Sequence, residues 1–239
     1  SLRRGNPFLK PEYIDSYELS YSKFKKGISF NTSAYFKYTN GLIQRIVTYN
    51  EDRSVSIVQQ ENTGNSRTYG LEFSIGGKIA PWWRIMLSGN GYYSQTRGTL
   101  SSVTNETYNL NNDAFGFRGN FNSNFKLKKN YDLQVTAWYN APTYFAQGRI
   151  KSMKSIDLSL KRKVLKEKGE ISLRLADVLD TQEFGIDLEI NNVKEQKLYN
   201  WESRNIFLGF SYRFGKETNS RRKSRNDHNE GDFNGGSDG

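Results

Sequence analysis

The sequence predicts an all-β, antiparallel up-and-down barrel wall of about nine strands that crosses a membrane. Apolar residues recur at alternate positions in many segments, which is the period of a strand with one apolar and one polar face. Aromatic residues make up 14% of a chain that is only 35% hydrophobic. No apolar run approaches the roughly eighteen residues of a membrane-spanning helix, whereas about ten alternating residues allow a barrel strand to cross a bilayer.

The last regular segment, residues 205–214, is the stretch around which the prediction is organised. Its apolar face consists of Ile206, Leu208, Phe210, Tyr212 and Phe214. Polar residues occupy the other parity, and Phe207 is the one exception. Such a face meets a second sheet in a soluble sandwich and meets lipid in an outer-membrane barrel.

Nine segments with this alternation follow one another. They are residues 16–22, 28–48, 56–75, 85–93, 115–127, 133–140, 156–161, 171–175 and 205–214. Before them, residues 5–12 contain two prolines and predict an ordered loop. Segment 115–127 alternates most clearly, with phenylalanines on one face and polar residues on the other. In segment 133–140 the polar face contains Trp138, which the pattern does not explain.

The connections alternate strictly in length. Short turns at residues 25–27, 80–83, 128–130 and 166–169 follow the first, third, fifth and seventh strands. Long polar loops at residues 49–54, 95–113, 142–149 and 180–203 follow the others. Outer-membrane barrels distribute periplasmic turns and extracellular loops in this way. The ninth strand then ends on the short-turn side, so we expect a periplasmic C-terminus.

The odd number of strands predicts a larger barrel. Bacterial single-chain barrels close with an even number of strands. The chain also begins Ser1-Leu2-Arg3, without an initiator methionine or a signal peptide. We therefore expect this chain to be the closing part of a longer protein.

Charged residues on the polar parity are candidates to face a water-filled lumen, because burying an unpaired ion is too costly. They are Glu18, Lys37, Glu72, Arg118, Asp157, Arg174 and Arg213. Pairing of the arginines with Glu72 and Asp157, or with another part of the protein, is the expected role. Aromatic residues predicted at the membrane interface are Tyr17, Tyr21, Trp82, Trp83, Phe210, Tyr212 and Phe214.

The chain divides into a barrel region, residues 1–215, and a charged, glycine-rich tail, residues 216–239, which we expect to be disordered. The formal net charge of +10 lies in the barrel region, since basic and acidic residues balance in the tail. Basic charge can attract nucleic acid, anionic lipid or anionic solutes. No helix-turn-helix, zinc-finger or RNA-binding motif occurs, so nucleic acid is not an expected partner.

Catalysis has little support in the sequence. The single histidine, His228, lies in the tail, and there is no cysteine. No serine triad or His/Cys metal site can therefore form in the barrel region. The carboxylates of the stretch 177–180 lack the spacing of a calcium loop, so this stretch is interpreted as a strand end. We expect no enzyme activity, no metal and no cofactor.

Several motifs, in this order, resemble the C-terminal barrel region of TonB-dependent receptors, specifically the outer membrane β-barrel type abundant in Bacteroidetes. They are Gly5-Asn6-Pro7 with Leu9-Lys10-Pro11-Glu12; Asn62, Gly64, Tyr69, Gly70 and Glu72; Ala146-Gln147-Gly148-Arg149; Asp177-Val178-Leu179-Asp180-Thr181; and Tyr212-Arg213-Phe214-Gly215-Lys216.

The resemblance implies part of a barrel of about 22 strands. Such a receptor holds a plug that contacts TonB, can cooperate with a surface lipoprotein and imports a bulky nutrient. It further implies that Phe214 is a signal for the barrel assembly machinery. Neither plug nor TonB box is in this sequence, and the tail departs from the family pattern. Gly70 and Glu72 are interpreted structurally, as a site of close wall packing and an inward carboxylate.

Two other interpretations remain open at this point. A free-standing small outer-membrane barrel would have a role in adhesion or structure. A soluble ligand-binding β-barrel would need its Phe and Tyr face buried against the rest of the chain.

Overall fold

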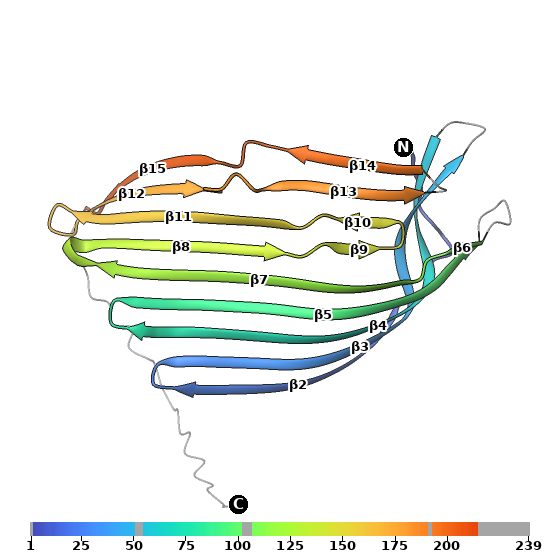
Figure 1. The fold of residues 1–239 in the computed structure, drawn as a ribbon, viewed down its shortest axis with the longest axis horizontal. Helices are drawn as coiled ribbons and strands as arrows, with labels where there is room; N and C mark the ends of the chain where they lie inside the picture. The colour runs from blue at the N-terminus through green and yellow to red at the C-terminus, as the bar shows by residue number, and fades with distance from the viewer. Residues whose placement is uncertain (1, 51–54, 102–106, 191–192, 215–239) are drawn as a thin grey trace, which may run out of the picture.

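The computed structural model describes residues 2–50, 55–101, 107–190 and 193–214 (Figure 1). Its strands are β1 (Leu2–Arg3), β2 (Tyr13–Lys25), β3 (Ile28–Asn50), β4 (Val55–Ala80), β5 (Trp83–Ser101), β6 (Thr107–Asn109), β7 (Asn112–Leu127), β8 (Tyr131–Asn140), β9 (Thr143–Phe145), β10 (Gly148–Ile150), β11 (Met153–Val164), β12 (Gly169–Ala176), β13 (Glu183–Ile190), β14 (Val193–Asn200) and β15 (Asn205–Tyr212). One 3-10 turn, η1 (Lys128–Asn130), joins β7 to β8. None of the helical structure described is long and apolar enough to cross a bilayer.

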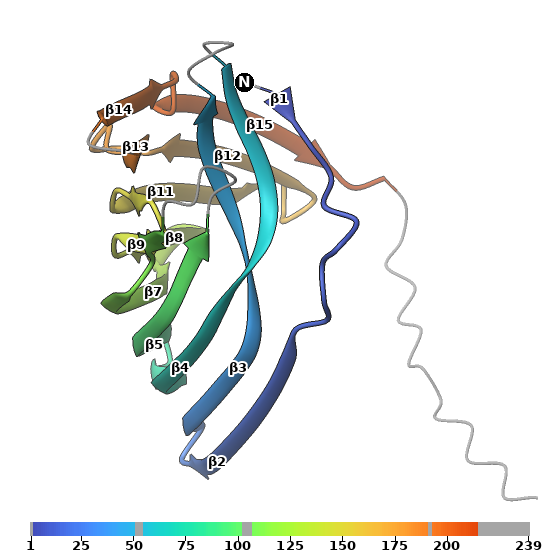
Figure 2. The same cartoon turned by 90° about the vertical axis from the view of Figure 1, so that its right-hand side faces the viewer.

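The main sheet confirms the predicted fold class. Nine long strands pair in the order β15-β12-β11-β8-β7-β5-β4-β3-β2, and every neighbouring pair in this series is antiparallel. The short strands β1 and β6 attach to β4 and β5. The sheet curves into an open wall (Figure 2). Within the described residues, the outer edges of β2 and β15 have no strand partner.

Three of the predicted long loops are wrong in part, because they contain strands. Residues 95–113 include the end of β5, the short strand β6 and the start of β7. Residues 142–149 include the β9–β10 hairpin, and residues 180–203 include the β13–β14 hairpin. These strands form a second sheet, β14-β13-β10-β9, that continues the wall beyond the ends of β8, β11, β12 and β15 (Figure 1). Charged residues occur on both parities of β14, so the sequence shows no apolar stripe in that strand.

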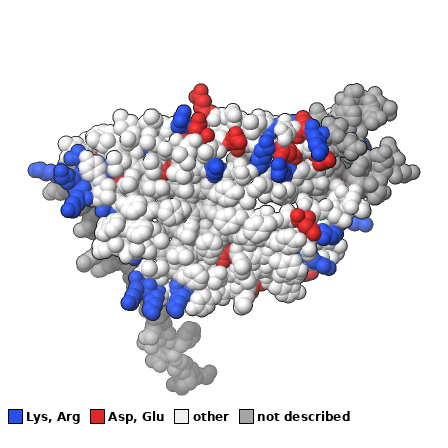
Figure 3. All heavy atoms as spheres, viewed as in Figure 1, with Lys and Arg blue, Asp and Glu red and all other residues white. Residues whose placement is uncertain are grey.

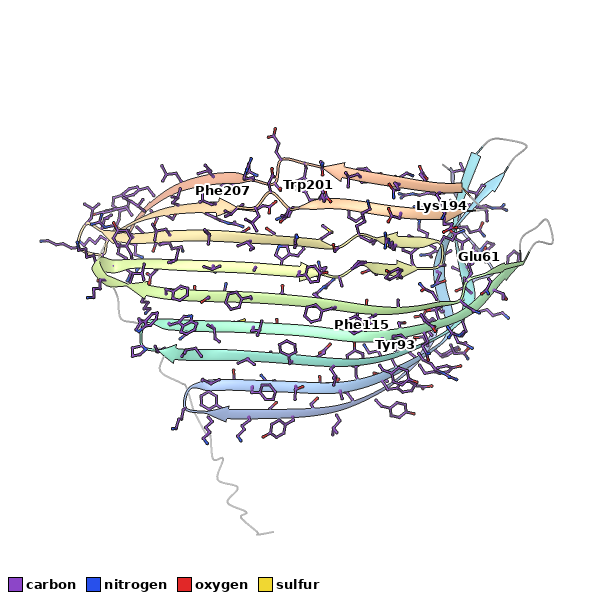
Figure 4. The ribbon with its side chains drawn as sticks, viewed as in Figure 1. Glu61, Tyr93, Phe115, Lys194, Trp201 and Phe207 are labelled. Carbon is purple, nitrogen blue, oxygen red and sulfur yellow. The ribbon has the colours of Figure 1, made fainter. Side chains whose placement is uncertain are left out.

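The apolar parity of the main strands is exposed. Leu19 of β2 is 79% exposed and Leu208 of β15 is 80% exposed. Tyr93 of β5 and Phe115 of β7 are register partners on this face, and both are exposed (Figure 4). The buried hydrophobic residues among those described are Ile46, Val58 and Leu110. A soluble barrel would bury its Phe and Tyr face, so this observation argues against the soluble interpretation.

Charge is distributed along the strand direction (Figure 3). In that view the central area below the upper edge is almost free of charged side chains, and Lys and Arg gather at the short-turn end. Both signs occur at the opposite end and along the upper edge, over β13 to β15. An uncharged belt between two charged ends is the surface that a membrane-spanning β-sheet presents to lipid.

Close packing of the wall explains the predicted role of Gly70. Gly70 of β4 pairs with Tyr35 of β3, and a Cβ at Gly70 would lie 2.1 Å from the tyrosine ring. The same arrangement recurs where Tyr92 of β5 covers Gly116 of β7. An aromatic side chain thus covers the space that each glycine leaves open, which stiffens a strand that glycine would otherwise weaken.

The far half of the β3–β4 hairpin leaves the wall. The β4–β5 pairing ends at Gly64, whose φ of +140° and whose 2.2 Å Cβ approach to the Arg97 carbonyl oxygen suit only glycine. Beyond this point β1 pairs in parallel with β4 at Ile57 and Val58. Figure 2 shows the hairpin curving away from β5 towards the level of β14.

The predicted loop of residues 5–12 anchors this hairpin. The Asn62 side chain accepts from the Lys10 N–H at 2.8 Å and donates to the Gly41 carbonyl at 2.8 Å. The Glu12 carboxylate accepts from the Ile43 N–H at 2.8 Å, next to a bulge in β3. The asparagine and glutamate that the sequence singled out here therefore satisfy main-chain groups along the edges that the hairpin exposes.

Candidate functional site

Polar side chains of β2, β3, β4, β5 and β7 line a shallow cavity of about 460 Å³ on the polar face. Three predicted lumen residues meet there: Glu18 from β2, Glu72 from β4 and Arg118 from β7. The remaining lining is mostly serine and asparagine. Strand pairing places these residues together, because side chains of one parity on neighbouring antiparallel strands share a face.

Glu72 and Lys37 belong to one network on this face. The Glu72 carboxylate accepts a short hydrogen bond from Asn90, and the Asn90 amide also meets the Tyr35 hydroxyl at 3.2 Å. The Lys37 ammonium lies 5.1 Å from the centre of the Tyr35 ring, within cation–π range. The tyrosine that covers Gly70 therefore also links the two predicted lumen charges.

The arginines have different partners. Arg174 Nη2 lies 2.7 Å from Asp157 Oδ2, so one of the three arginines pairs with one of the two expected carboxylates. Arg118 instead donates to the Asn140 side-chain oxygen at 2.9 Å. Arg213 follows β15 at the short-turn end, where its N–H donates to the Lys168 carbonyl at 2.8 Å.

Phe207 departs from the alternation because it lies beside Arg174 on the polar face. The two residues are register partners, and the Arg174 guanidinium is 5.8 Å from the Phe207 ring centre. The ring thus covers one side of a guanidinium whose other contact is Asp157.

The predicted interface aromatics lie at different heights. Trp82 and Trp83 stack with Phe125 at the short-turn end, and the Trp83 indole donates to the Ser123 hydroxyl at 2.8 Å. Tyr212 and Phe214 pack edge to face at the same end, with ring centroids 4.7 Å apart.

Three further aromatics in that set lie within strands. Tyr17 and Tyr21 pair with Phe36 and Phe30 inside the β2–β3 ladder. Phe210 is exposed on the apolar parity of β15. Contact of all these rings with headgroups stays a prediction.

The short-turn end is basic. Three of its four turns contain a pair of lysines, namely Lys25 with Lys26, Lys128 with Lys129, and Lys166 with Lys168. All six side chains are exposed. Cations next to an uncharged belt and stacked tryptophans suit the phosphates of a membrane surface.

The opposite end contains a second cavity, of about 670 Å³, between the β3–β4 hairpin and the four-stranded sheet. Gln147, in the β9–β10 turn, joins its two sides. Its side-chain oxygen accepts from the Val47 N–H at 2.7 Å, and its side-chain nitrogen donates to the Val47 carbonyl at 2.8 Å. A residue 100 positions away thus satisfies the free edge of β3.

Asp177 lies where β12 gives way to β13, and it is fully buried. Its carboxylate accepts from the N–H groups of Thr181 and Gln182, both at 2.9 Å, and from the Ser203 hydroxyl at 2.6 Å. Burial opposes ionisation, but these donors outweigh it and hold the pKa of Asp177 below its ordinary value. The stretch 177–180 directly follows β12, which ends at Ala176, and it is therefore a strand end as the sequence predicts.

Beyond β12, Asp187 of β13 is the centre of an ion-pair cluster. It lies 2.8 Å from Arg149 and 3.6 Å from Lys151. The hydrogen bond from Arg149 lowers the pKa of Asp187. In the part of the chain that the structure describes, no three His, Cys, Asp or Glu side chains are grouped to hold a metal ion. His228 and the tail 216–239 lie outside the described residues.

Residues 1–212 match a family model described as the outer membrane protein beta-barrel family. The chain belongs to this family. Its exposed apolar belt, its polar concave cavity and its antiparallel wall are the features expected of an outer membrane beta-barrel.

Two solved structures are similar to this family member. The ferric yersiniabactin uptake receptor FyuA from Yersinia pestis has a TM-score of 0.55 and 15% identity, over 83% of this chain and 29% of that one. The outer membrane transporter YddB from Escherichia coli has a TM-score of 0.47 and 14% identity, over 90% of this chain and 34% of that one. The chain thus spans about a third of their length. No curated protein matches the sequence.

Sequence reasoning missed the second cavity of this barrel-family chain. The apolar residues that line it, such as Phe184 and Ile186, were assigned to a polar loop. One available signal is the alternation of Phe184, Ile186, Leu188 and Ile190 with polar residues along β13. A second is the Ala146–Arg149 motif, which the sequence alone marks only by its resemblance to the family. Its glutamine holds the hairpin and its arginine pairs with Asp187.

Proposed function

We propose that this chain is the closing part of the wall of a Bacteroidetes-type TonB-dependent receptor that imports a bulky nutrient through the outer membrane. The observation that carries the proposal is that the nine long strands of the main sheet have an exposed apolar face on one side and a polar concave face with charged residues on the other. Lipid covers the first face, and the second face lines a hydrated lumen. The open edges of β2 and β15 then pair with the remaining strands of the receptor.

In this proposal the short turns and the C-terminus are periplasmic. The stacked tryptophans and the six exposed lysines of the short turns contact headgroups there. The mixed charges and the second cavity at the other end then belong to the extracellular recognition surface. This orientation agrees with the strict alternation of short turns and longer excursions.

The partners follow from that position. They are outer-membrane lipid, the rest of the receptor with its plug and through it TonB, and in some systems a surface lipoprotein. Phe214, 89% exposed just after β15 on its apolar parity, is the proposed signal for the barrel assembly machinery. We assign the chain no catalytic activity.

Uptake by cells tests the proposal. A strain lacking the gene is compared with its complemented parent on a panel of limiting nutrients, with and without a protonophore. We expect the deletion strain to lose uptake of one nutrient class. The complemented strain should take up that class, and the protonophore should abolish this uptake. Normal energised uptake of every nutrient together with lost surface adhesion would favour the small structural barrel instead.

A further inference from the structure

The cavity behind the β3–β4 hairpin has the size and the wall of a small-ligand site. Its volume of about 670 Å³ falls within the range of small-molecule pockets, and it is separate from the polar cavity on β2 to β7. Phe145, Ile150 and Ile186 line the sheet side. Val47 and Val58 line the hairpin side. An apolar chemical group is the natural occupant of these walls.

The charges at this cavity are unbalanced. Lys197 and Glu195 pair at 3.1 Å and largely neutralise each other. Arg45, on the hairpin side, is exposed and has no carboxylate partner within the described residues. An apolar pocket with one unpaired guanidinium favours a ligand that combines an apolar body with an acidic group.

In the described ranges, a single side chain makes the hydrogen bonds between the hairpin and the four-stranded sheet. The two hydrogen bonds between Gln147 and the Val47 main chain are the ones that join these two parts in the described ranges. Both lie at the cavity, since Gln147 and Val47 line it. Breaking them frees one wall of the cavity while leaving both sheets intact.

We propose that this cavity binds an amphipathic anion, with its apolar or aromatic body between the hairpin and the sheet and its acidic group at Arg45. Gln147 is the positioning residue that holds the hairpin over the ligand. The binding site is argued independently of the proposed function. Only the statement that this ligand is the imported nutrient rests on that function.

An introduced thiol reports on the site, because this chain has no cysteine and any cysteine elsewhere in the full protein is first replaced by serine. The Ile186→Cys variant of the full protein is placed in nanodiscs, and its rate of reaction with a membrane-impermeant maleimide is measured. The measurement is made with and without the probe anilinonaphthalene sulfonate, an aromatic anion. We expect the probe to slow labelling about tenfold, and Arg45→Gln to remove most of that protection, since one ion pair changes affinity by roughly fivefold. Gln196→Cys, on the opposite parity of β14, should be unaffected. Leu188→Cys replaces Ile186→Cys if the latter does not fold.

The two hydrogen bonds between Gln147 and Val47, called the clasp from here on, are tested in the same assay without the probe. Gln147→Ala should raise the labelling rate at position 186 about tenfold. Two hydrogen bonds stabilise the closed position of the hairpin, and their loss should raise the fraction of molecules with an open cavity by about this factor. Gln147→Glu keeps the acceptor and loses the donor, so an intermediate rate is expected. Gln134→Ala, which removes an amide from the polar face of β8, is the matched control and should leave the rate unchanged.

The outcomes separate the inference from the proposed function. Equal labelling with and without the probe, or protection that persists in Arg45→Gln, overturns the ligand assignment even where uptake is normal. An unchanged rate in Gln147→Ala overturns the clasp. Arg45-dependent protection in a protein that supports no uptake would uphold the binding site and remove the import proposal.

Discussion

At the scale of single residues, Asp177 shows how one carboxylate organises the place where strands are offset. Its acceptor oxygens gather donors from Thr181, Gln182 and Ser203, which belong to two separate connections. The Asp157 carboxylate in turn accepts from the Asp177 N–H at 3.0 Å. Charge-assisted hydrogen bonds therefore tie together the two connections that run between the main sheet and the second sheet.

We expect Asp177→Asn to lower the free energy of unfolding by about 2 kcal/mol, because a buried cluster of donors loses its charged acceptor. Ser203→Ala removes one donor of that cluster and should cost about 1 kcal/mol. Urea titrations of the protein in lipid, followed by its heat-modifiable mobility on gels, measure both values. Equal stability of wild type and Asp177→Asn would contradict the role assigned to the carboxylate.

The same residue predicts a loss of stability in acid. The folded-state pKa of Asp177 is lowered from its ordinary value of 3.8, so the unfolded chain binds the proton more readily. Its contribution to stability is complete above that value and disappears as the pH falls through the lower, folded-state pKa. Unfolding midpoints at pH 7 and pH 3 should therefore differ more in wild type than in Asp177→Asn.

Gly70 and Tyr35 form a pair that can be tested by coupled substitution. Gly70→Ala places a methyl group 2.1 Å from the ring and should destabilise the wall by about 1–3 kcal/mol through overpacking. Tyr35→Ala in the same chain removes the obstacle, so the double variant should lose less than the sum of the single variants. Additive losses in the urea titration would show that the two residues do not interact.

At the scale of elements, the nine long strands were predictable because each carries its own signal. In β7 the phenylalanines and their polar neighbours alternate over a whole membrane crossing. Strand parity also places Asp157 and Arg174 on one face, and Gly70 and Tyr35 on one face. The register of the strands, which parity does not give, makes them neighbours.

By contrast β6, β9, β10, β13 and β14 lie in stretches that the sequence predicts as loops. The strands β6, β9 and β10 have three residues each, too few to show a period, and β14 has polar residues on both faces. In β13 apolar residues do alternate, at Phe184, Ile186, Leu188 and Ile190, so this strand could have been predicted.

Contacts between distant elements carry no such signal. The clasp between Gln147 and Val47 joins residues 100 positions apart, and nothing in either local pattern specifies it. Phe207 and Trp138 could be recognised as exceptions to alternation, but only the neighbouring strand shows that Phe207 covers Arg174. Sequence periodicity therefore predicts the faces of strands and leaves open how the ends of the wall fold.

The two faces of β7 predict opposite outcomes for one substitution. Phe121→Arg places a charge on the apolar face and should cost about 2–4 kcal/mol near the middle of the bilayer. Asn122→Arg places it on the polar face and should be tolerated. Folded yield in the outer membrane measures the difference, and equal yields of the two variants would contradict the assignment of the faces.

At the scale of the whole molecule, the described residues contain few buried hydrophobic side chains. Hydrogen-bonded ladders, aromatic cover over glycine and polar networks on the inner face hold the wall together. Such a sheet is stable where lipid covers its apolar parity and neighbouring strands cover its edges. This is why the chain makes physical sense as part of a barrel and not as a soluble domain.

The measurement that tests this account most directly is a spin-label scan along β7. Single cysteines replace Phe117, Arg118, Asn120, Phe121 and Asn122 in the protein reconstituted in bilayers, and each label is probed with oxygen and with a water-soluble nickel chelate. Labels at positions 117 and 121 should collide mainly with oxygen, and those at 118, 120 and 122 mainly with the nickel chelate. Five labels with the same preference, or labels at 117 and 121 shielded from both reagents, would contradict the account.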